Sequence, residues 1–119
     1  MKWFLLAIVV GPTVAPVQLT VTPQVSVYRY PAFVHAQTRI ARHAENRWRT
    51  LSWASETGMS GLRLRELAGE HAQVSYDEFI EVTPGAYLIR ACIYRTTVVR
   101  PDGSPLCAPT VRVRVIGEE

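Results

Sequence analysis

Lysine and long apolar runs are the two things this chain most clearly lacks. One lysine, Lys2, stands beside twelve arginines in 119 residues, and the net charge is +3. That charge, which drops by one if Lys2 is removed, is too small to predict binding to nucleic acid. The longest apolar run, Trp3–Val10, has eight residues, whereas a membrane-spanning helix needs about 20. The sequence therefore predicts no nucleic-acid partner and no transmembrane span.

Recognisable catalytic motifs are also missing. No serine has a Gly-x-Ser-x-Gly context, and no glycine-rich loop could hold a phosphate. Asp77, Glu78 and Glu81 are the closest approach to the paired carboxylates of glycosidases. On a strand, however, alternation turns Glu78 away from the other two. We therefore expect solvated strand charges here and no enzyme.

The chain has only three histidines. His35 and His43 share a strand parity, but eight residues at about 3.3 Å each would separate them by roughly 26 Å. No pair that includes His71 has the close spacing typical of zinc ligands. We expect no metal site and no cofactor.

Residues 1–15 have the pattern of a secretion signal. Lys2 is a minimal positive start, the apolar run follows, and Thr13-Val14-Ala15 is a small-residue cleavage site. Pro16 would follow the cut and disfavours cleavage there, and a buried first strand is the alternative interpretation. The sequence thus predicts a signal-like segment over 1–15, one domain over 16–119, and a secreted, periplasmic or cell-surface location.

Short segments with period-two alternation fill that domain, and eight prolines and seven glycines separate them. Pro23 splits the first into two pieces, which is typical of an edge strand that breaks and changes sheet. Leu62, Leu64 and Leu67 fit either a strand or a helical turn. The remaining segments predict an all-β fold; the expected strands are Gln18–Thr22, Val25–Tyr28, Val34–Arg42, Trp48–Glu56, Val74–Val82, Tyr87–Tyr94 and Thr110–Ile116.

The segment Val82–Arg95 organises the rest. After Pro84-Gly85, Tyr87 and Ile89 fall on one face of the predicted strand, and Leu88 and Tyr94 fall on the other. Its expected partner is Thr110–Ile116. We predict that Tyr87 and Trp53 are central to the core, that the Tyr87 hydroxyl reaches a nearby backbone group, and that Tyr94 faces out.

Several short stretches together resemble small bacterial secreted immunoglobulin-like domains. They are Asn46-Arg47-Trp48, Leu51-Ser52-Trp53, Glu56-Thr57-Gly58, Leu67-Ala68-Gly69 and the stretch from Thr83 to Ala91. The resemblance covers about residues 17–116 and implies a β-sandwich of about seven antiparallel strands, with a core tryptophan in the third. It implies an architecture and not a function. The region around Ile40 lacks a cysteine, so the inter-sheet disulfide of antibody domains cannot form.

Cys92 and Cys107 are the only cysteines. In an oxidising compartment an even count favours a bridge, which would close a loop of about 15 residues and stabilise the fold by roughly 3 kcal/mol. Two buried free thiols are the alternative.

One possible interaction patch combines arginines with a tryptophan; its residues are Arg39, Arg42, Arg47, Trp48 and Arg49. Arginine and tryptophan are typical of interface hot spots, although charged strand edges that discourage aggregation give the same pattern. We expect a non-catalytic secreted or cell-surface interaction module with a protein partner. The alternative is a structural subunit of a surface filament or particle, in which the Val17–Tyr28 segment adds to a neighbour's sheet.

Overall fold

The computed structural model describes residues 15–67, 74–95 and 105–117, and these residues form strands and turns without any helix. Accordingly, none of them belongs to a helix that could cross a membrane. Most of the expected signal segment, residues 1–14, lies outside the described residues, as does His71.

The described residues form nine strands, which confirms the all-β prediction. The strands are β1 (Val17–Thr22), β2 (Val25–Val27), β3 (Ala32–Ile40), β4 (Asn46–Ser55), β5 (Ser60–Glu66), β6 (Val74–Val82), β7 (Gly85–Arg95), β8 (Leu106–Cys107) and β9 (Val111–Ile116). The leucine-rich segment that the sequence left undecided is therefore strand β5.

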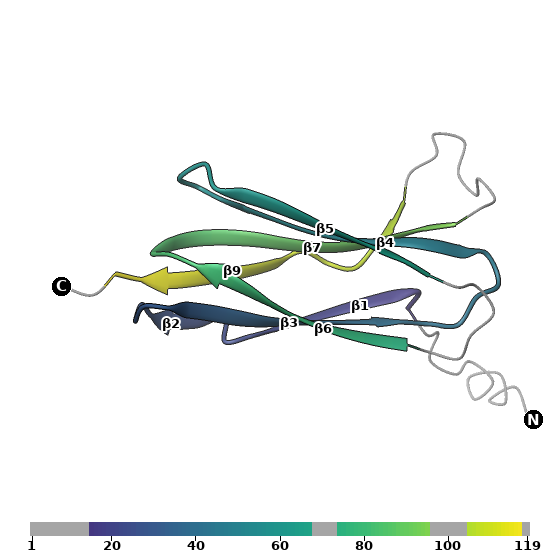
Figure 1. Ribbon diagram of the computed structural model, residues 1–119, viewed down its shortest axis with the longest axis horizontal. Coiled ribbons are helices and arrows are strands. Elements are labelled where there is room, and N and C mark those ends of the chain that lie inside the picture. Colours follow the sequence, from purple (N-terminus) through teal and green to yellow (C-terminus); the bar gives the residue numbers. More distant parts are fainter. Residues whose placement is uncertain (1–14, 68–73, 96–104, 118–119) are drawn as a thin grey trace, which may run out of the picture.

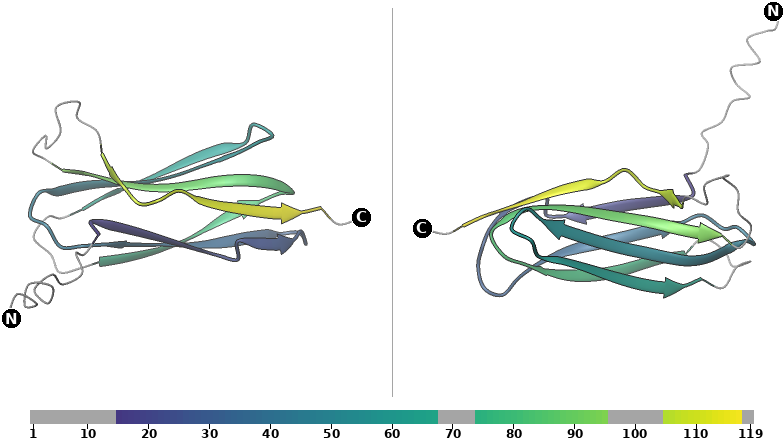
Figure 2. Two further views of the ribbon diagram at one scale, coloured as in Figure 1. Left: turned by 180° about the vertical axis from the view of Figure 1, so that it is seen from behind. Right: turned by 90° about the horizontal axis from the view of Figure 1, so that it is seen from above.

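Two sheets lie one above the other, as Figure 1 and the left panel of Figure 2 show. We call them the small sheet, with strand order β1-β3-β6, and the large sheet, with order β2-β9-β7-β4-β5 and β8 paired to β7. Neighbouring strands are antiparallel except for β2 and β9, which run parallel. The expectation of antiparallel pairing throughout is wrong at that one position.

The first strand changes sheet where the sequence predicts it. β1 pairs with β3 in the small sheet, from Val17 opposite Ile40 to Thr22 opposite His35. Pro23 then interrupts the ladder, because proline has no N–H to donate, and β2 joins the large sheet beside β9. The N-terminal segment thus contributes an edge strand to both layers.

The hairpin of β7 and β9 has the predicted partners, with Tyr87 opposite Val113. Gly85 opens β7 with φ +137°, a conformation that side-chain-bearing residues rarely adopt. This turn sends Tyr87 into the interior, where it is 1% exposed, while its hydroxyl accepts a hydrogen bond from the Thr83 N–H at 2.9 Å. Tyr94, on the opposite face, is 38% exposed. Both predictions for this strand are confirmed.

The core between the sheets is aliphatic around Tyr87. Its largest members come from inward-facing positions on both layers; they are Val17, Val21, Val34, Ile40, Leu51, Ile80, Val82, Ile89, Ile93 and Val113. Trp53 does not have the central place predicted for it. It is only partly buried and packs against the margin of this cluster.

The position of Trp53 follows from its cross-strand neighbour. Trp53 pairs with Gly61 of β5, and the indole ring lies across the space where a Cβ of Gly61 would be. The Arg63 guanidinium lies over the other side of the indole, 5.3 Å from the ring centroid. The ring is therefore held between β5 and an arginine rather than between the two sheets.

Candidate functional site

A buried ion pair joins the two sheets, through β4 of the large sheet and β6 of the small sheet. Arg49 of β4 is 0% exposed and Glu78 of β6 is 7% exposed. The Arg49 guanidinium donates to both carboxylate oxygens, at 2.6 Å and 3.1 Å. Such fork-to-fork pairs are among the strongest hydrogen-bonded contacts in proteins. Glu78 is therefore not a solvated strand charge, which corrects the sequence-based expectation for this residue.

Two further arginines, both on β5, close the open side between β5 and β6. Arg63 donates to the main-chain oxygen of Phe79 at 3.0 Å. The Arg65 Nε lies 4.0 Å from Glu78, and its guanidinium lies 4.6 Å from the ring centroid of Tyr76. The inward side of this margin thus carries two arginines beside the carboxylate of Glu78, while Glu66 lies on the outward parity of β5.

The predicted disulfide is present. Cys92 of β7 and Cys107 of β8 are bonded, with a Cα–Cα distance of 4.0 Å. They are directly opposite in the β7–β8 ladder. The bridge lies on the outward parity of β7 and fastens the strand β8 to the large sheet. A disulfide of this kind indicates an oxidising compartment.

The proposed arginine–tryptophan patch is divided by the fold. Arg49 points into the interior and cannot belong to a surface patch. Arg39 lies exposed on β3 of the small sheet, whereas Arg47 and Trp48 lie exposed on β4 of the large sheet. Arg42 lies in the connection between β3 and β4. Of the five residues, only Trp48 belongs to the apolar surface described next.

The outward face of the large sheet carries the main group of exposed apolar side chains in the described chain. We call it the outer apolar cluster; its residues are Trp48, Leu62, Leu64, Leu88 and Tyr94. Their exposed fractions run from 38% for Tyr94 to 65% for Leu62. The strand register places Trp48 directly beside Tyr94, and Leu62 and Leu64 follow on the neighbouring strand. The cluster therefore spans β7, β4 and β5, which lie side by side in the right panel of Figure 2.

Three arginines extend this face toward β9. Arg112 and Arg114 lie outward on β9, and Arg90 lies outward on β7. The side chains of Arg112 and Arg114 make no hydrogen bond or ion pair with the described residues. Among the described residues, the Arg90 guanidinium donates a hydrogen bond only to the sulfur of Cys107, at 3.5 Å. Arginines thus gather on the β9 side of this face, beside the exposed apolar side chains of β2.

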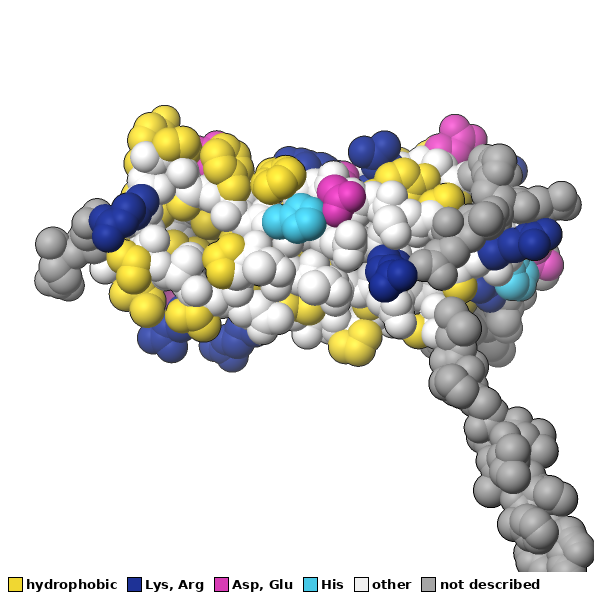
Figure 3. Space-filling model, turned by 90° about the horizontal axis from the view of Figure 1, so that it is seen from below, with side chains coloured by type: hydrophobic (Ala, Val, Ile, Leu, Met, Phe, Trp, Pro, Cys, Tyr) yellow, Lys and Arg dark blue, Asp and Glu magenta, His cyan; other side chains and the backbone are white. Residues whose placement is uncertain are grey.

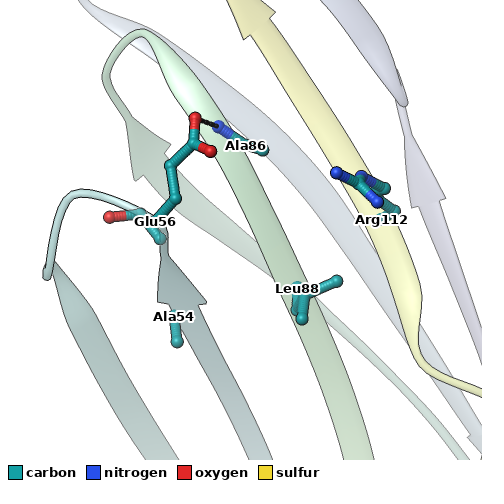
Figure 4. A pocket seen from close by; sticks show the side chains of 6 residues that line it. Ala54, Glu56, Ala86, Leu88 and Arg112 are labelled. Carbon is teal, nitrogen blue, oxygen red and sulfur yellow. Dashed lines mark hydrogen bonds between the residues drawn. The ribbon is translucent and has the colours of Figure 1, made fainter.

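A hollow of about 220 Å³ lies at the end of this face where β4 ends and β7 begins. Its floor is Ala86 and Leu88, and Figure 4 shows Glu56 and Arg112 on opposite sides of it. The Glu56 carboxylate accepts a hydrogen bond from the Ala86 N–H at 3.3 Å. The small side chain of Ala86 leaves the space, so the hollow can receive one side chain of a partner.

The outer face of the small sheet is different. His35 and Asp77 are hydrogen-bonded at 2.8 Å, and Gln37 also donates to Asp77. The His35 ring lies 5.0 Å from that of Phe79 across the strands. Figure 3, which looks onto this side, shows a histidine against an acidic side chain with apolar groups scattered around them. Within the described residues, no three histidine, cysteine, aspartate or glutamate side chains are close enough to hold a metal ion.

Sequence reasoning missed the pairing of Arg49 with Glu78. Each residue left a signal, because Arg49 shares its parity with Leu51 and Trp53, and Glu78 interrupts the apolar parity of β6. A charged residue in an apolar series points inward and needs a partner. At a sequence separation of 29 residues, no local pattern pairs the two.

Comparison with known proteins gives this site no relative from which a role could be read. No family model matches the chain, and no curated protein or solved structure is significantly similar to it.

Proposed function

We propose that this chain is a non-catalytic interaction module, secreted or displayed at a cell surface, and that it binds a protein partner through the outer apolar cluster. The observation that carries the proposal is the exposure of five large apolar side chains on one sheet face. Large apolar side chains that gather in water on one face are typical of an interaction site. The disulfide supports a location in an oxidising compartment.

An immunoglobulin-like architecture is part of this proposal. The split of the first strand between both sheets supports it, as does the strand order in each layer. The Tyr87 hydroxyl bonded to the Thr83 backbone resembles the tyrosine corner of such domains. The pair of Arg49 and Glu78 joins the two sheets through β4 and β6, whereas the inter-sheet disulfide of antibody domains would need a cysteine near Ile40 on β3.

The composition of the cluster favours a protein as the partner. Trp48 and Tyr94 combine a large apolar ring with a polar group, which is the chemistry enriched at protein interfaces. The adjacent Arg90 and Arg112 provide guanidinium groups that could pair with a partner's carboxylates. A partner with an apolar centre and an acidic margin would complement both parts of the face.

The filament-subunit alternative receives no comparable support. It needs the N-terminal strand to be available for a neighbour, yet β1 pairs with β3 and β2 pairs with β9 of the same chain. We therefore keep the interaction module as the proposed function.

Site-specific photo-crosslinking tests the proposal. A benzophenone amino acid is placed at Tyr94, on the proposed face, or at Phe33, which is similarly exposed on the small sheet. In cells that express the chain naturally, we expect one dominant protein adduct from position 94 and none from position 33. The captured protein is then purified and titrated against the wild type and a variant with Leu62→Ser and Leu64→Ser.

The expected result is a loss of about tenfold or more in affinity for the double variant, as for removal of interface anchors. Equal adducts from positions 33 and 94, or unchanged affinity in the double variant, would contradict the proposal.

A further inference from the structure

Strand β5 forms one margin of the large sheet. Its seven residues pair with β4 in an unbroken register, from Trp48 opposite Glu66 to Ala54 opposite Ser60. The strand order ends at β5, so no described strand pairs with its other side. β5 contains no proline and no bulge, which are two of the devices that protect edge strands.

The hydrogen-bonding pattern identifies which backbone groups of β5 are free. The Ser55 N–H donates to the Met59 carbonyl, and the Leu67 N–H donates to the Arg47 carbonyl. These two bonds flank the ladder, and bonded pairs alternate with non-bonded pairs between antiparallel strands. Odd-numbered residues of β5 therefore bond to β4. The N–H and C=O groups of Leu62 and Leu64 point away from the sheet.

The side chains at these two residues belong to the outer apolar cluster. Leu62 is 65% exposed and Leu64 is 57% exposed. A strand added beside β5 would thus gain main-chain hydrogen bonds and apolar contact from the same two residues. This combination is the usual basis of recognition by strand addition.

The odd-numbered residues add a charge preference. Arg63 and Arg65 lie on the inward parity of β5, at its open margin. The nearest carboxylate, Glu78, already accepts from Arg49 with both oxygens. This margin therefore keeps an excess of positive charge, which favours acidic side chains in a strand laid beside it.

The other sheet margins are less suited to a guest. On β6 the Phe79 carbonyl already accepts a hydrogen bond from Arg63. β2 has only three residues, and β1 ends at Pro23. In the described part of the chain, β5 is the margin that combines length, free backbone groups and exposed apolar side chains.

We propose that β5 accepts an extended segment of the partner protein as an added strand, in which acidic residues beside Arg63 and Arg65 alternate with apolar residues beside Leu62 and Leu64. This inference rests on the proposed function and specifies the partner's chemistry. A second copy of the chain is a poorer occupant, because its own β5 has arginines where carboxylates are needed.

Two peptides and two variants test the inference. The first peptide is a blocked seven-residue chain that alternates valine with glutamate, and the second has lysine in place of glutamate. Binding to the full chain is measured by fluorescence anisotropy. The glutamate peptide should bind at least about tenfold more tightly than the lysine peptide, a difference typical of a few close charge pairs.

The variants separate backbone from side-chain recognition. Leu64→Pro removes the outward N–H but leaves the β4 ladder intact, since proline is tolerated at such edge positions. Leu64→Thr keeps that N–H and removes apolar surface. Leu64→Pro should abolish measurable binding of the glutamate peptide, whereas Leu64→Thr should retain it with reduced affinity. Circular dichroism melts check that both variants are folded.

Four outcomes would overturn the inference. Equal binding of both peptides would refute the charge preference, and unchanged binding by Leu64→Pro would refute strand addition. Failure of both peptides to bind would refute the proposed strand addition as well. A dimer in sedimentation that Leu64→Pro disrupts would make the occupant a second copy. In each case the crosslinking result at Tyr94 stands separately, so the proposed function is judged on its own evidence.

Discussion

The two faces of the large sheet use the same kinds of side chain in opposite ways. On the inward face, Arg49 is bonded to a carboxylate and Tyr87 to a backbone N–H. On the outward face, Arg112 makes no side-chain hydrogen bond within the described residues, and Tyr94 remains 38% exposed. The inward arginine and tyrosine thus have partners within the chain, although the buried Arg49 Nε has none among the described residues, and the outward pair remains open to solvent.

Because of this difference, we expect substitutions on the inward face to affect stability and substitutions on the outward face to affect binding. Substitutions on the inward face leave a cavity or an unpaired buried group, both of which are costly. Substitutions on the outward face remove surface that water already reaches, and such changes are usually within about 0.5 kcal/mol in stability. Matched changes on the two faces therefore test the comparison directly.

The largest contrast should come from the two tyrosines of β7. Tyr87→Ala should destabilise the fold by about 3–5 kcal/mol, because it removes a buried ring and its hydrogen bond to Thr83. Tyr94→Ala should cost less than about 1 kcal/mol, since its ring is partly in water. Thermal and urea unfolding of both variants measures this. Equal losses would contradict the assignment of faces.

Breaking the ion pair should have the next largest effect. Glu78→Gln leaves Arg49 buried without its counter-charge and should cost about 3 kcal/mol. Glu81→Gln is the matched control, because Glu81 is on the same strand but faces outward. It should have almost no effect on stability. Replacing both partners, with Arg49→Met and Glu78→Leu, should recover most of the loss, because no buried charge then remains. Urea unfolding that shows no recovery in the double variant would contradict this account.

Removal of the disulfide should lower the stability of the fold somewhat less than breaking the ion pair. Cys92→Ser with Cys107→Ser opens a loop with a separation of 15 residues, and should cost about 2–3 kcal/mol. The wild type, denatured without reductant, should show no free thiol on titration with a thiol reagent. Detection of two thiols in the wild type would contradict the bridge.

The sequence allows much of this fold to be predicted, because alternation encodes which face of a strand is buried. The faces of β7, the sheet change at Pro23 and the pairing of Cys92 with Cys107 all follow from local pattern or residue chemistry. The antiparallel expectation failed at β2, where three residues carry too little pattern to set a direction.

Side-chain partners on different strands could not be predicted in the same way. The place of Trp53 depends on Gly61 and Arg63, which join it only through the register of β4 and β5. The strand assignment of β5 was itself undecided, because leucines at i, i+2 and i+5 fit two periods. The outer apolar cluster depends on that same register, so it could be recognised only in the fold.

Amide hydrogen exchange along β5, followed by NMR, tests directly whether this strand is an open edge that can receive a partner strand. In the free protein, the account predicts rapid exchange at Leu62 and Leu64, and exchange slower by about tenfold or more at Arg63 and Arg65, whose N–H groups bond to β4. The glutamate-containing peptide should then slow exchange at Leu62 and Leu64. Equal protection of all four amides in the free protein, or no added protection with the peptide, would contradict an open edge that receives a partner strand.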